Sequence, residues 1–328
     1  MDDYSKYIIG AYATSPTLNE WKEEKEIEYY EEIKKNLNIK GLELPFWGTL
    51  HEYNEELFLT LLDKRWQYVV TTLPGTMKSL SQNPNFGVAS DDEDGRKEAI
   101  KFLKSANAAI KKINDFFGEQ KVFNVALATA PSLAATGVSS SSKALIKSLE
   151  ELVTFDWQGA QIVIEHCDSG RADHIVKGFL SLEEEIEAVQ YINKHCNQSI
   201  GFTVNWARSV LERRDVSTPK EHIKLLSELN LLKGLMFSGT SANSIDYGSW
   251  SDLHLPIAKE SGISFYEESS LLTSHVIKDC LLHAHAQELN YLGVKVLSMP
   301  IGDSSMQRRI GLNRDTLKVV DKILKEIQ

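Results

Sequence analysis

Eight short apolar segments, each followed by a longer amphipathic stretch, constrain the fold of this chain more than any other feature of its sequence. We expect strands at residues 7–12, 41–44, 67–72, 122–128, 161–165, 200–204, 234–237 and 294–298. Strands that alternate with helices in this way form parallel sheets with right-handed crossovers. The sequence therefore predicts an α/β fold, a (β/α)8 TIM barrel, in which residues 1–328 form a single domain.

A doubly wound open sheet is the structural alternative. It is disfavoured because no G-x-G-x-x-G motif follows the first expected strand.

A long insertion at 239–270 follows the seventh strand, and a loop of this length predicts a lid or a binding loop.

Helical spacing and capping patterns predict the helices. Ser181 and Glu184 form a capping-box pattern, and Thr218 is a predicted N-cap before Pro219 and Glu221. Asn313 is the predicted N-cap of the last helix. The expected helices cover 20–36, 54–62, 96–117, 139–153, two segments that begin at Ser181 and Thr218, 271–292 and 313–328.

Composition narrows the class of partner and the compartment. The formal net charge is −10, so we expect no nucleic-acid partner, since backbone phosphates require a positive surface. No apolar run approaches the roughly 18 residues that span a bilayer, so we expect no membrane partner. Cys167, Cys196 and Cys280 are odd in number and widely spaced, which predicts reduced thiols and a cytoplasmic protein. The sequence leaves open whether the chain forms a homo-oligomer.

Charged residues end the fifth expected strand. Barrel enzymes carry their chemistry at the carboxyl ends of the strands, and this strand runs into Glu165, His166 and Asp168. A buried strand needs no such charges for stability, so Glu165 and His166 are candidate catalytic residues and Asp168 a candidate substrate ligand. The alternative is a structural ion pair between Glu165 and a neighbouring arginine.

Glu43 ends the second expected strand in the same way. The second and fifth strands of a barrel face each other, so Glu43 and Glu165 can flank a substrate and share the roles of acid and base. The alternative is that Glu43 accepts hydrogen bonds from backbone amides at the end of the barrel.

Polar residues at three further places are candidate substrate ligands. Asn205, Trp206 and Arg208 follow the sixth strand, where they suit the hydroxyls and apolar face of a sugar. Ser238 ends the seventh strand, and His254 lies in the insertion two residues after Asp252. Simpler alternatives are a capping asparagine, a core tryptophan and surface positions for Asp252 and His254. Arg208 can also pair with Glu165 or grip an anionic substrate.

The loops after the seventh and eighth strands offer a phosphate site. Residues 238–241 and 302–305 are rich in small residues, and Arg308 and Arg309 follow, although Asp303 opposes an anion.

Absent motifs exclude several reaction classes. The sequence has no G-x-x-x-x-G-K-[ST], H-E-x-x-H or G-x-S-x-G motif. Thr129 and Ser238 stand where barrel glycosidases commonly place their two carboxylates, so retaining glycoside hydrolysis is disfavoured. Lys295 is expected at the start of the eighth strand, so we expect no lysine late in a strand to form a Schiff base.

The GLELPF segment at 41–46, the IEHCD segment at 164–168 and the overall layout resemble the xylose isomerase-like barrels. That superfamily contains sugar isomerases, sugar epimerases and an endonuclease branch. Within it the chain is most similar to a poorly characterised bacterial family. The resemblance covers nearly the whole length, and its local motifs are short.

The resemblance implies a divalent metal, Mn, Mg or Zn, held by acids and a histidine on strands five to eight. Glu165 matches the strand-five glutamate, and Glu43 resembles a strand-two glutamate near the substrate. Asn205 stands where an acid is expected, Ser238 where histidine is common, and residues 299–300 where a glutamate is expected. Because hard cations need several oxygen donors, this ligand set is incomplete, unless other acids or histidines, namely His166, Asp168, Asp252 or His254, rebuild it.

These observations predict an isomerase or epimerase of a sugar, sugar acid or sugar phosphate that works by carboxylate-mediated proton transfer. A non-catalytic carbohydrate-binding barrel and a metal-independent lyase or hydrolase with His166 as its base are the alternatives. The predicted catalytic residues are Glu165, Glu43 and His166, and the predicted substrate ligands are Asn205, Trp206, Arg208, Asp168, Ser238 and His254.

Overall fold

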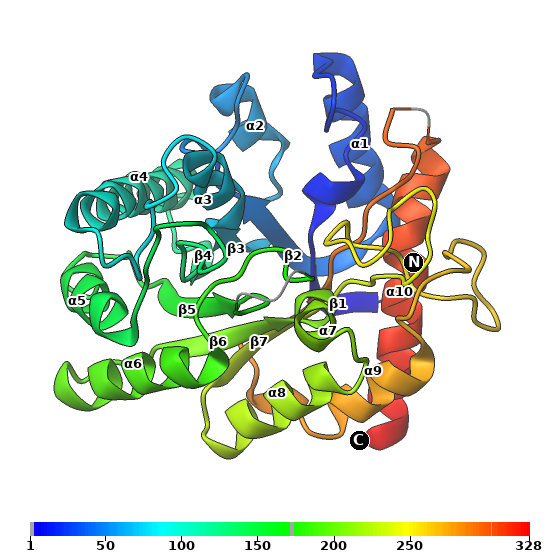
Figure 1. Cartoon of the computed structure of the whole chain (residues 1–328). Helices are drawn as coiled ribbons and strands as arrows, with labels where there is room; N and C mark the ends of the chain where they lie inside the picture. Colours follow the sequence, from blue (N-terminus) through cyan, green and yellow to red (C-terminus); the bar gives the residue numbers. More distant parts are fainter. Residues whose placement is uncertain (1–2, 171–173, 303) are drawn as a thin grey trace. The chain divides into compact units, whose positions relative to one another are not determined.

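The computed structural model describes residues 3–170, 174–302 and 304–328, and its eight strands form a closed parallel barrel in chain order (Figure 1). The predicted (β/α)8 barrel is confirmed. The strands are β1 (Asp3–Ile9), β2 (Asn38–Pro45), β3 (Gln67–Thr71), β4 (Val122–Leu127), β5 (Gln161–His166), β6 (Gly201–Asn205), β7 (Leu232–Phe237) and β8 (Tyr291–Val294).

Helices separate the strands, and none that the structure describes is both long and apolar enough to cross a bilayer. The helices are α1 (Glu23–Asn36), α2 (Glu55–Leu61), α3 (Leu73–Leu80), α4 (Glu93–Phe117), α5 (Ser142–Leu152), α6 (Leu182–His195), α7 (Trp206–Arg213), α8 (Thr218–Glu228), α9 (Ser274–Leu281) and α10 (Met306–Ile327). Two 3-10 turns, η1 (Ala11–Thr14) and η2 (Ala286–Glu288), complete the set.

The predicted N-cap residues agree with the structure at one helix and differ from it at two others. The predicted capping box is confirmed, because the Ser181 and Glu184 side chains each bond to the other residue's backbone N–H at the start of α6. The predicted cap at Thr218 is wrong, since Ser217 is the N-cap of α8 and makes no side-chain cap bond. Asn313 lies inside α10, whose N-cap is Ser305.

Two expected elements differ from the structure, and two helices were not expected. The predicted helix over 271–292 is too long: α9 ends at Leu281, and His285 adopts a left-handed φ of 44°. β8 consequently begins at Tyr291 and ends at Val294, so Lys295 follows the strand instead of opening it. α3 and α7, which follow β3 and β6, are absent from the expected helices.

The chain divides into two compact units. Unit 1 comprises Met1–Glu43, Thr60–Gln67 and Val204–Gln328, and unit 2 comprises Leu44–Leu59 and Tyr68–Thr203. The single domain over 1–328 stays a prediction.

Unit 1 holds four neighbouring parallel strands. β7 pairs with β8, β8 with β1, and β1 with β2. α10, red in Figure 1, packs against β1 and β8, and the Tyr7 hydroxyl donates to Asp321 Oδ1 on that helix at 2.9 Å. Tyr7 therefore points out of β1 towards its covering helix.

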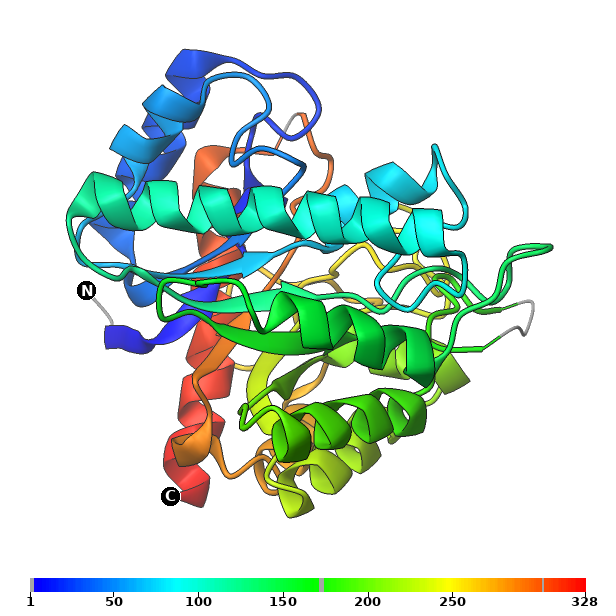
Figure 2. The same ribbon diagram turned by 90° about the vertical axis from the view of Figure 1, so that its left-hand side faces the viewer.

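Unit 2 holds β3, β4 and β5, which pair in parallel in that order. α4, α5 and α6 lie side by side over these strands (Figure 2). Nearly every residue along β4 and β5 is buried, as expected for a parallel sheet covered on both faces.

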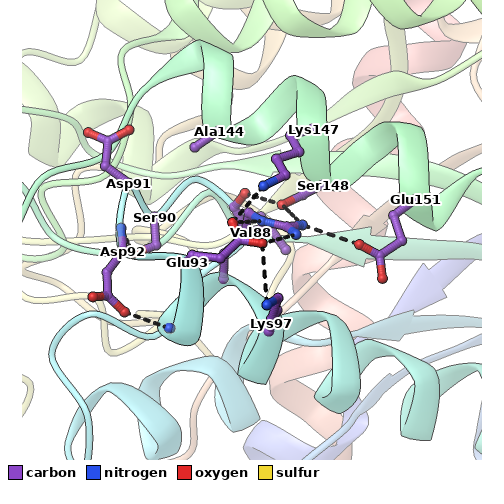
Figure 3. A network of polar contacts seen from close by, with 12 residues as sticks. Val88, Ser90, Asp91, Asp92, Glu93, Lys97, Ala144, Lys147, Ser148 and Glu151 are labelled. Carbon is purple, nitrogen blue, oxygen red and sulfur yellow. Dashed lines mark hydrogen bonds and ion pairs between the residues drawn. The ribbon is translucent and has the colours of Figure 1, made fainter.

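A network of hydrogen bonds and ion pairs connects α4 to α5 within unit 2 (Figure 3). The buried Arg96 guanidinium donates to both carboxylate oxygens of Glu93 at 3.0 Å and to Glu151 Oε2 at 3.3 Å. Lys147 Nζ also donates to Glu93 at 2.7 Å. The hydrogen bonds from Arg96, followed by those from Lys147, lower the pKa of Glu93 to about 2 from its ordinary 4.5.

The lowered pKa of Glu93 predicts a pH-dependent stability. Because its folded pKa lies below its unfolded pKa, the stabilisation is full above 4.5 and is lost as the pH falls through about 2. We expect Glu93→Gln to be less stable than the wild type at pH 6, and the difference to close between pH 5 and pH 2. Urea unfolding at several pH values measures it, with exposed Glu28→Gln as the control. A difference that does not change with pH would contradict the assignment.

Candidate functional site

Glu165 faces the interior of the barrel from β5. Thr71 Oγ1, at the end of β3, donates to Glu165 Oε2 at 2.7 Å. β4 lies between these two strands, and side chains of alternate strands meet only on the concave inner face of a barrel. The carboxylate is 2% exposed. Its predicted position at the carboxyl end of β5 therefore agrees with the structure, while its catalytic role stays a prediction.

His166 faces the opposite way from Glu165. Its Nδ1 lies 2.7 Å from Glu185 Oε2 on α6, and Thr129 Oγ1 donates to Glu185 Oε1 at 2.5 Å. All three side chains are buried. Because successive residues of a strand alternate between its faces, His166 lies on the outer face of β5 and holds α6 in place. Its role as a catalytic base stays a prediction.

Asp168 anchors its own loop. Its Oδ2 accepts the backbone N–H groups of Val176 and Lys177 at 2.6 and 2.7 Å, and the side chain is fully buried. Two backbone hydrogen bonds to one carboxylate oxygen are typical of a loop-fixing residue. Asp168 Oδ2 therefore has a structural role, while the predicted substrate contact of Asp168 stays a prediction.

In unit 1, Glu43 and Lys295 form a buried ion pair. Lys295 Nζ lies 2.7 Å from Glu43 Oε1, and the two side chains are 1% and 3% exposed. Glu43 lies near the carboxyl end of β2 and Lys295 follows β8, on either side of β1. The pair thus spans β1 on the inner face of the barrel.

Residues that follow β1 complete this cluster. The Tyr12 hydroxyl donates to Glu43 Oε1 at 3.3 Å, and Lys295 Nζ lies 5.1 Å from the centroid of the Tyr12 ring. A Cβ on Gly10 would lie only 2.8 Å from Lys295 Cγ, so glycine at this position leaves room for the lysine side chain. Lys295 was not a predicted site residue, because the eighth strand was expected to begin at 294 and in the structure begins at Tyr291. The apolar run that starts at Tyr291 is the signal that would have found it.

A second polar cluster joins three of the predicted substrate ligands. Ser238 Oγ donates to Asn205 Oδ1 at 2.9 Å and lies 3.2 Å from His254 Nδ1. Asn205 ends β6 and Ser238 follows β7. Among the residues that the structure describes, Asn205 Nδ2 has no hydrogen-bond partner although it is buried. The structure therefore brings Asn205, Ser238 and His254 together at the carboxyl ends of neighbouring strands.

The insertion holds His254 through its backbone. His254 adopts a left-handed φ of 52°, and its carbonyl accepts the Leu297 N–H at 2.7 Å. Gly239 and Leu255 exchange two backbone hydrogen bonds of 2.8 and 2.9 Å. Tyr247 packs with Leu255 and Leu297 in a small buried cluster of its own. The insertion is thus a packed element of unit 1 that fixes His254 next to the strand ends.

Arg208 and Trp206 lie in α7, and both side chains are buried. Arg208 Nε donates to Asp252 Oδ2 at 3.0 Å, and the two side chains are 2% and 9% exposed. Asp252 Oδ1 lies 3.5 Å from His254 Nδ1, so the acid links Arg208 to the second cluster. Trp206 is fully buried, as the alternative of a core tryptophan requires, and its predicted contact with a sugar stays a prediction.

Arg309, one of the two arginines beside the predicted phosphate site, is hydrogen-bonded within the protein. The buried Arg309 guanidinium donates to the carbonyl oxygens of Ser304, Thr14 and Ser15, each at 3.0 Å. These bonds tie the start of α10 to the segment after β1. Asp303 lies outside the described residues.

A cavity of about 760 Å³ lies at the other end of the strands of unit 1. Its lining includes Tyr7, Lys40 and Leu292, which stand at the amino-terminal or middle positions of β1, β2 and β8. Barrel enzymes place their catalytic residues at the carboxyl ends of the strands, so we assign this cavity no part in catalysis.

Comparisons with known proteins give a family model and a relative that match nearly the whole chain. The model of a family described as "Domain of unknown function (DUF4862)" matches residues 8–312. The uncharacterized protein STM3670 of Salmonella typhimurium LT2 is 33% identical over 322 residues, which cover 98% of this chain and 99% of that protein.

Several solved structures share the barrel at low sequence identity. A xylose isomerase domain-containing protein of Salmonella typhimurium LT2 has a TM-score of 0.58 at 11% identity, over 98% of this chain and 99% of its own. The IolI protein with a bound zinc atom has a TM-score of 0.59 at 14% identity, over 97% and 99%. L-ribulose 3-epimerase has a TM-score of 0.59 at 12% identity, over 98% and 95%. These similarities show a xylose isomerase-like TIM barrel.

The metal that the resemblance implies does not fit the donors of unit 1. Asn205 and Ser238 are neutral and bond to each other, and Met299 packs against the apolar cluster of the insertion. No three His, Cys, Asp or Glu side chains described within unit 1 lie close enough together to hold an ion. Hard divalent cations prefer several carboxylate or water oxygens, so we derive no catalytic step through a metal.

The Arg208–Asp252 pair predicts a large effect on stability. Asp252→Ala leaves a buried guanidinium without its carboxylate, which typically costs about 3–5 kcal/mol. The Arg213–Glu221 pair, with its side chains 54% and 53% exposed, is the matched control, and Glu221→Ala should cost about 0–1 kcal/mol. Chemical denaturation measures both. Equal losses in the two variants would contradict the buried pair.

Proposed function

We propose that this chain, which belongs to the DUF4862 family, is a sugar isomerase or epimerase. The barrel that it shares with L-ribulose 3-epimerase supports the general class. The observation that carries the proposal is the buried Glu43 carboxylate at the carboxyl end of β2, bonded to Lys295 and Tyr12.

Glu43 is the group that moves the proton. Isomerases and epimerases of this kind take a proton from a carbon next to a carbonyl, and a positioned carboxylate is a suitable base. The proton passes to Glu43, and the electron pair of the broken C–H bond forms an enediolate. Transfer of the hydroxyl proton from one enediolate oxygen to the other, followed by return of the carbon-bound proton to the neighbouring carbon, gives the isomer. Return to the first carbon from its other face, by a second acid, gives the epimer.

Asn205, Ser238 and His254 bind the hydroxyl groups of the sugar. An amide, a hydroxyl and an imidazole supply both donors and acceptors, as a polyol requires. The buried Asn205 Nδ2, which lacks a partner among the described residues, would donate to a substrate oxygen. Arg309 is occupied by backbone carbonyls, which favours an unphosphorylated sugar.

We place this activity in the cytoplasm. Cys167, Cys196 and Cys280 are all free thiols, and such cysteines are typical of proteins that work in a reducing compartment.

Replacement of Glu43 tests the proposal. In a panel of aldoses and ketoses followed by proton NMR, the wild type should convert at least one sugar, and Glu43→Gln should lower kcat by about 10²–10⁴-fold because it removes the base. Glu26→Gln is the matched control, since Glu26 is also buried in unit 1 but lies on α1, where it accepts a hydrogen bond from Trp21. Sugar binding without any conversion would instead favour a carbohydrate-binding barrel and would contradict the proposal.

Glu165 is the second candidate carboxylate, and it has its own control. Glu165→Gln keeps the size of the side chain and removes the negative charge that faces the barrel interior. We expect turnover to fall by about 10²-fold or more, with the far-UV circular dichroism unchanged. Glu185→Gln alters the carboxylate on the outer side of β5 and should retain turnover if it folds. Full activity in Glu165→Gln would remove Glu165 from the proposed machinery.

A further inference from the structure

Three cationic side chains of lysine or arginine are buried in the described part of unit 1, and their bonding partners differ. Arg309 donates to backbone carbonyls, and Arg208 pairs with Asp252 of the insertion. Both arginines lie on helices. Lys295 lies instead at the carboxyl end of a strand, and its partner Glu43 lies across β1 on the inner face of the barrel.

We propose that the Lys295 ammonium stabilises the negatively charged oxygen that forms when Glu43 removes the proton, so that the reaction needs no divalent metal. This role rests on the proposed function. The role implies that the substrate is an α-hydroxy carbonyl compound, such as a ketose, whose carbonyl oxygen lies beside Lys295.

The step balances without a further reactant. The C–H bond breaks, the proton moves to a Glu43 oxygen, and its electron pair forms the C=C bond of the enediolate. The carbonyl π electrons move onto oxygen, where the ammonium meets the new negative charge. The reverse movement returns the proton from Glu43 to carbon and restores the carbonyl group, so nothing is oxidised or reduced overall.

The position of Lys295 suits this role. Its ammonium lies 2.7 Å from the carboxylate that acts as base, so an oxygen adjacent to the reacting carbon falls within its reach. A lysine that is 1% exposed acts in a site with little water, where a charge stabilises an oxyanion far more than it does in solvent. Such a cation performs the polarising task that a metal ion performs elsewhere, and the neutral Asn205 and Ser238 would hold a metal poorly.

A purely structural ion pair is the alternative, and the surroundings of Lys295 argue against it. Buried ion pairs add little net stability over apolar residues of the same size. This pair also requires glycine at position 10, because a Cβ there would approach Lys295 Cγ to 2.8 Å. Function explains this arrangement better than stability does.

Hydrogen exchange at carbon tests the proposal directly. Protein freed of metal by EDTA is incubated in D₂O with L-ribulose, D-fructose or dihydroxyacetone, and proton NMR follows the loss of the C–H signal next to the carbonyl. We expect wild-type exchange to persist in EDTA and to change less than about twofold on addition of Mg²⁺, Mn²⁺ or Zn²⁺. Lys295→Met should lower exchange about 10²–10³-fold, as loss of an oxyanion-stabilising group does.

Two further variants keep the test decisive. Lys121→Met removes a buried lysine of unit 2 that pairs with Glu119 at 2.7 Å, and it should exchange at the wild-type rate. Lys295→Arg keeps the positive charge and should retain measurable metal-free exchange. If Lys295→Met fails to fold, a folded Lys295→Arg without metal-free exchange overturns the proposal.

The outcomes separate this role from the proposed function. Exchange that occurs only with added metal overturns the role of Lys295 and leaves the isomerase or epimerase activity standing. Wild-type exchange in Lys295→Met overturns the role in the same way. The absence of exchange and of sugar conversion under every condition overturns both.

Discussion

The ion pair between Lys295 and Glu43 is the interaction on which the account of this protein depends. Two opposite charges lie 2.7 Å apart in a region closed to water, where removing each from solvent costs several kcal/mol. The surrounding chain accommodates that arrangement: Gly10 leaves room for the lysine side chain and Tyr12 donates to the acid. A low local dielectric makes the same pair a strong source of electrostatic stabilisation for a reacting oxygen.

The alternation of side chains along a strand explains why similar groups serve different purposes here. Glu165 points into the barrel and bonds to Thr71, whereas the next residue, His166, points out and pairs with Glu185 on α6. One short strand thus supplies a candidate reactive carboxylate and a buried pair that fixes a covering helix. The same rule separates Tyr7, which reaches α10, from the residues that line the inner face.

The sequence predicted those features that local chemistry determines. The barrel follows from the alternation of apolar strands and helices, and the start of α6 follows from Ser181 and Glu184. Glu43 and Glu165 could be placed at strand ends because each interrupts an apolar run. Lys295 could not, because β8 has only four residues and the preceding helix ends far earlier than its spacing indicates. The partners of Arg208 and His254 come from distant segments, so no local pattern identifies them.

A crystal structure with L-ribulose bound, determined from protein treated with EDTA, would show whether Lys295 holds the sugar carbonyl oxygen. The account predicts a sugar carbonyl oxygen about 3 Å from Lys295 Nζ, with a Glu43 oxygen next to the neighbouring C–H group. A sugar bound away from this pair, or one whose carbonyl oxygen is held by a metal ion, would contradict it.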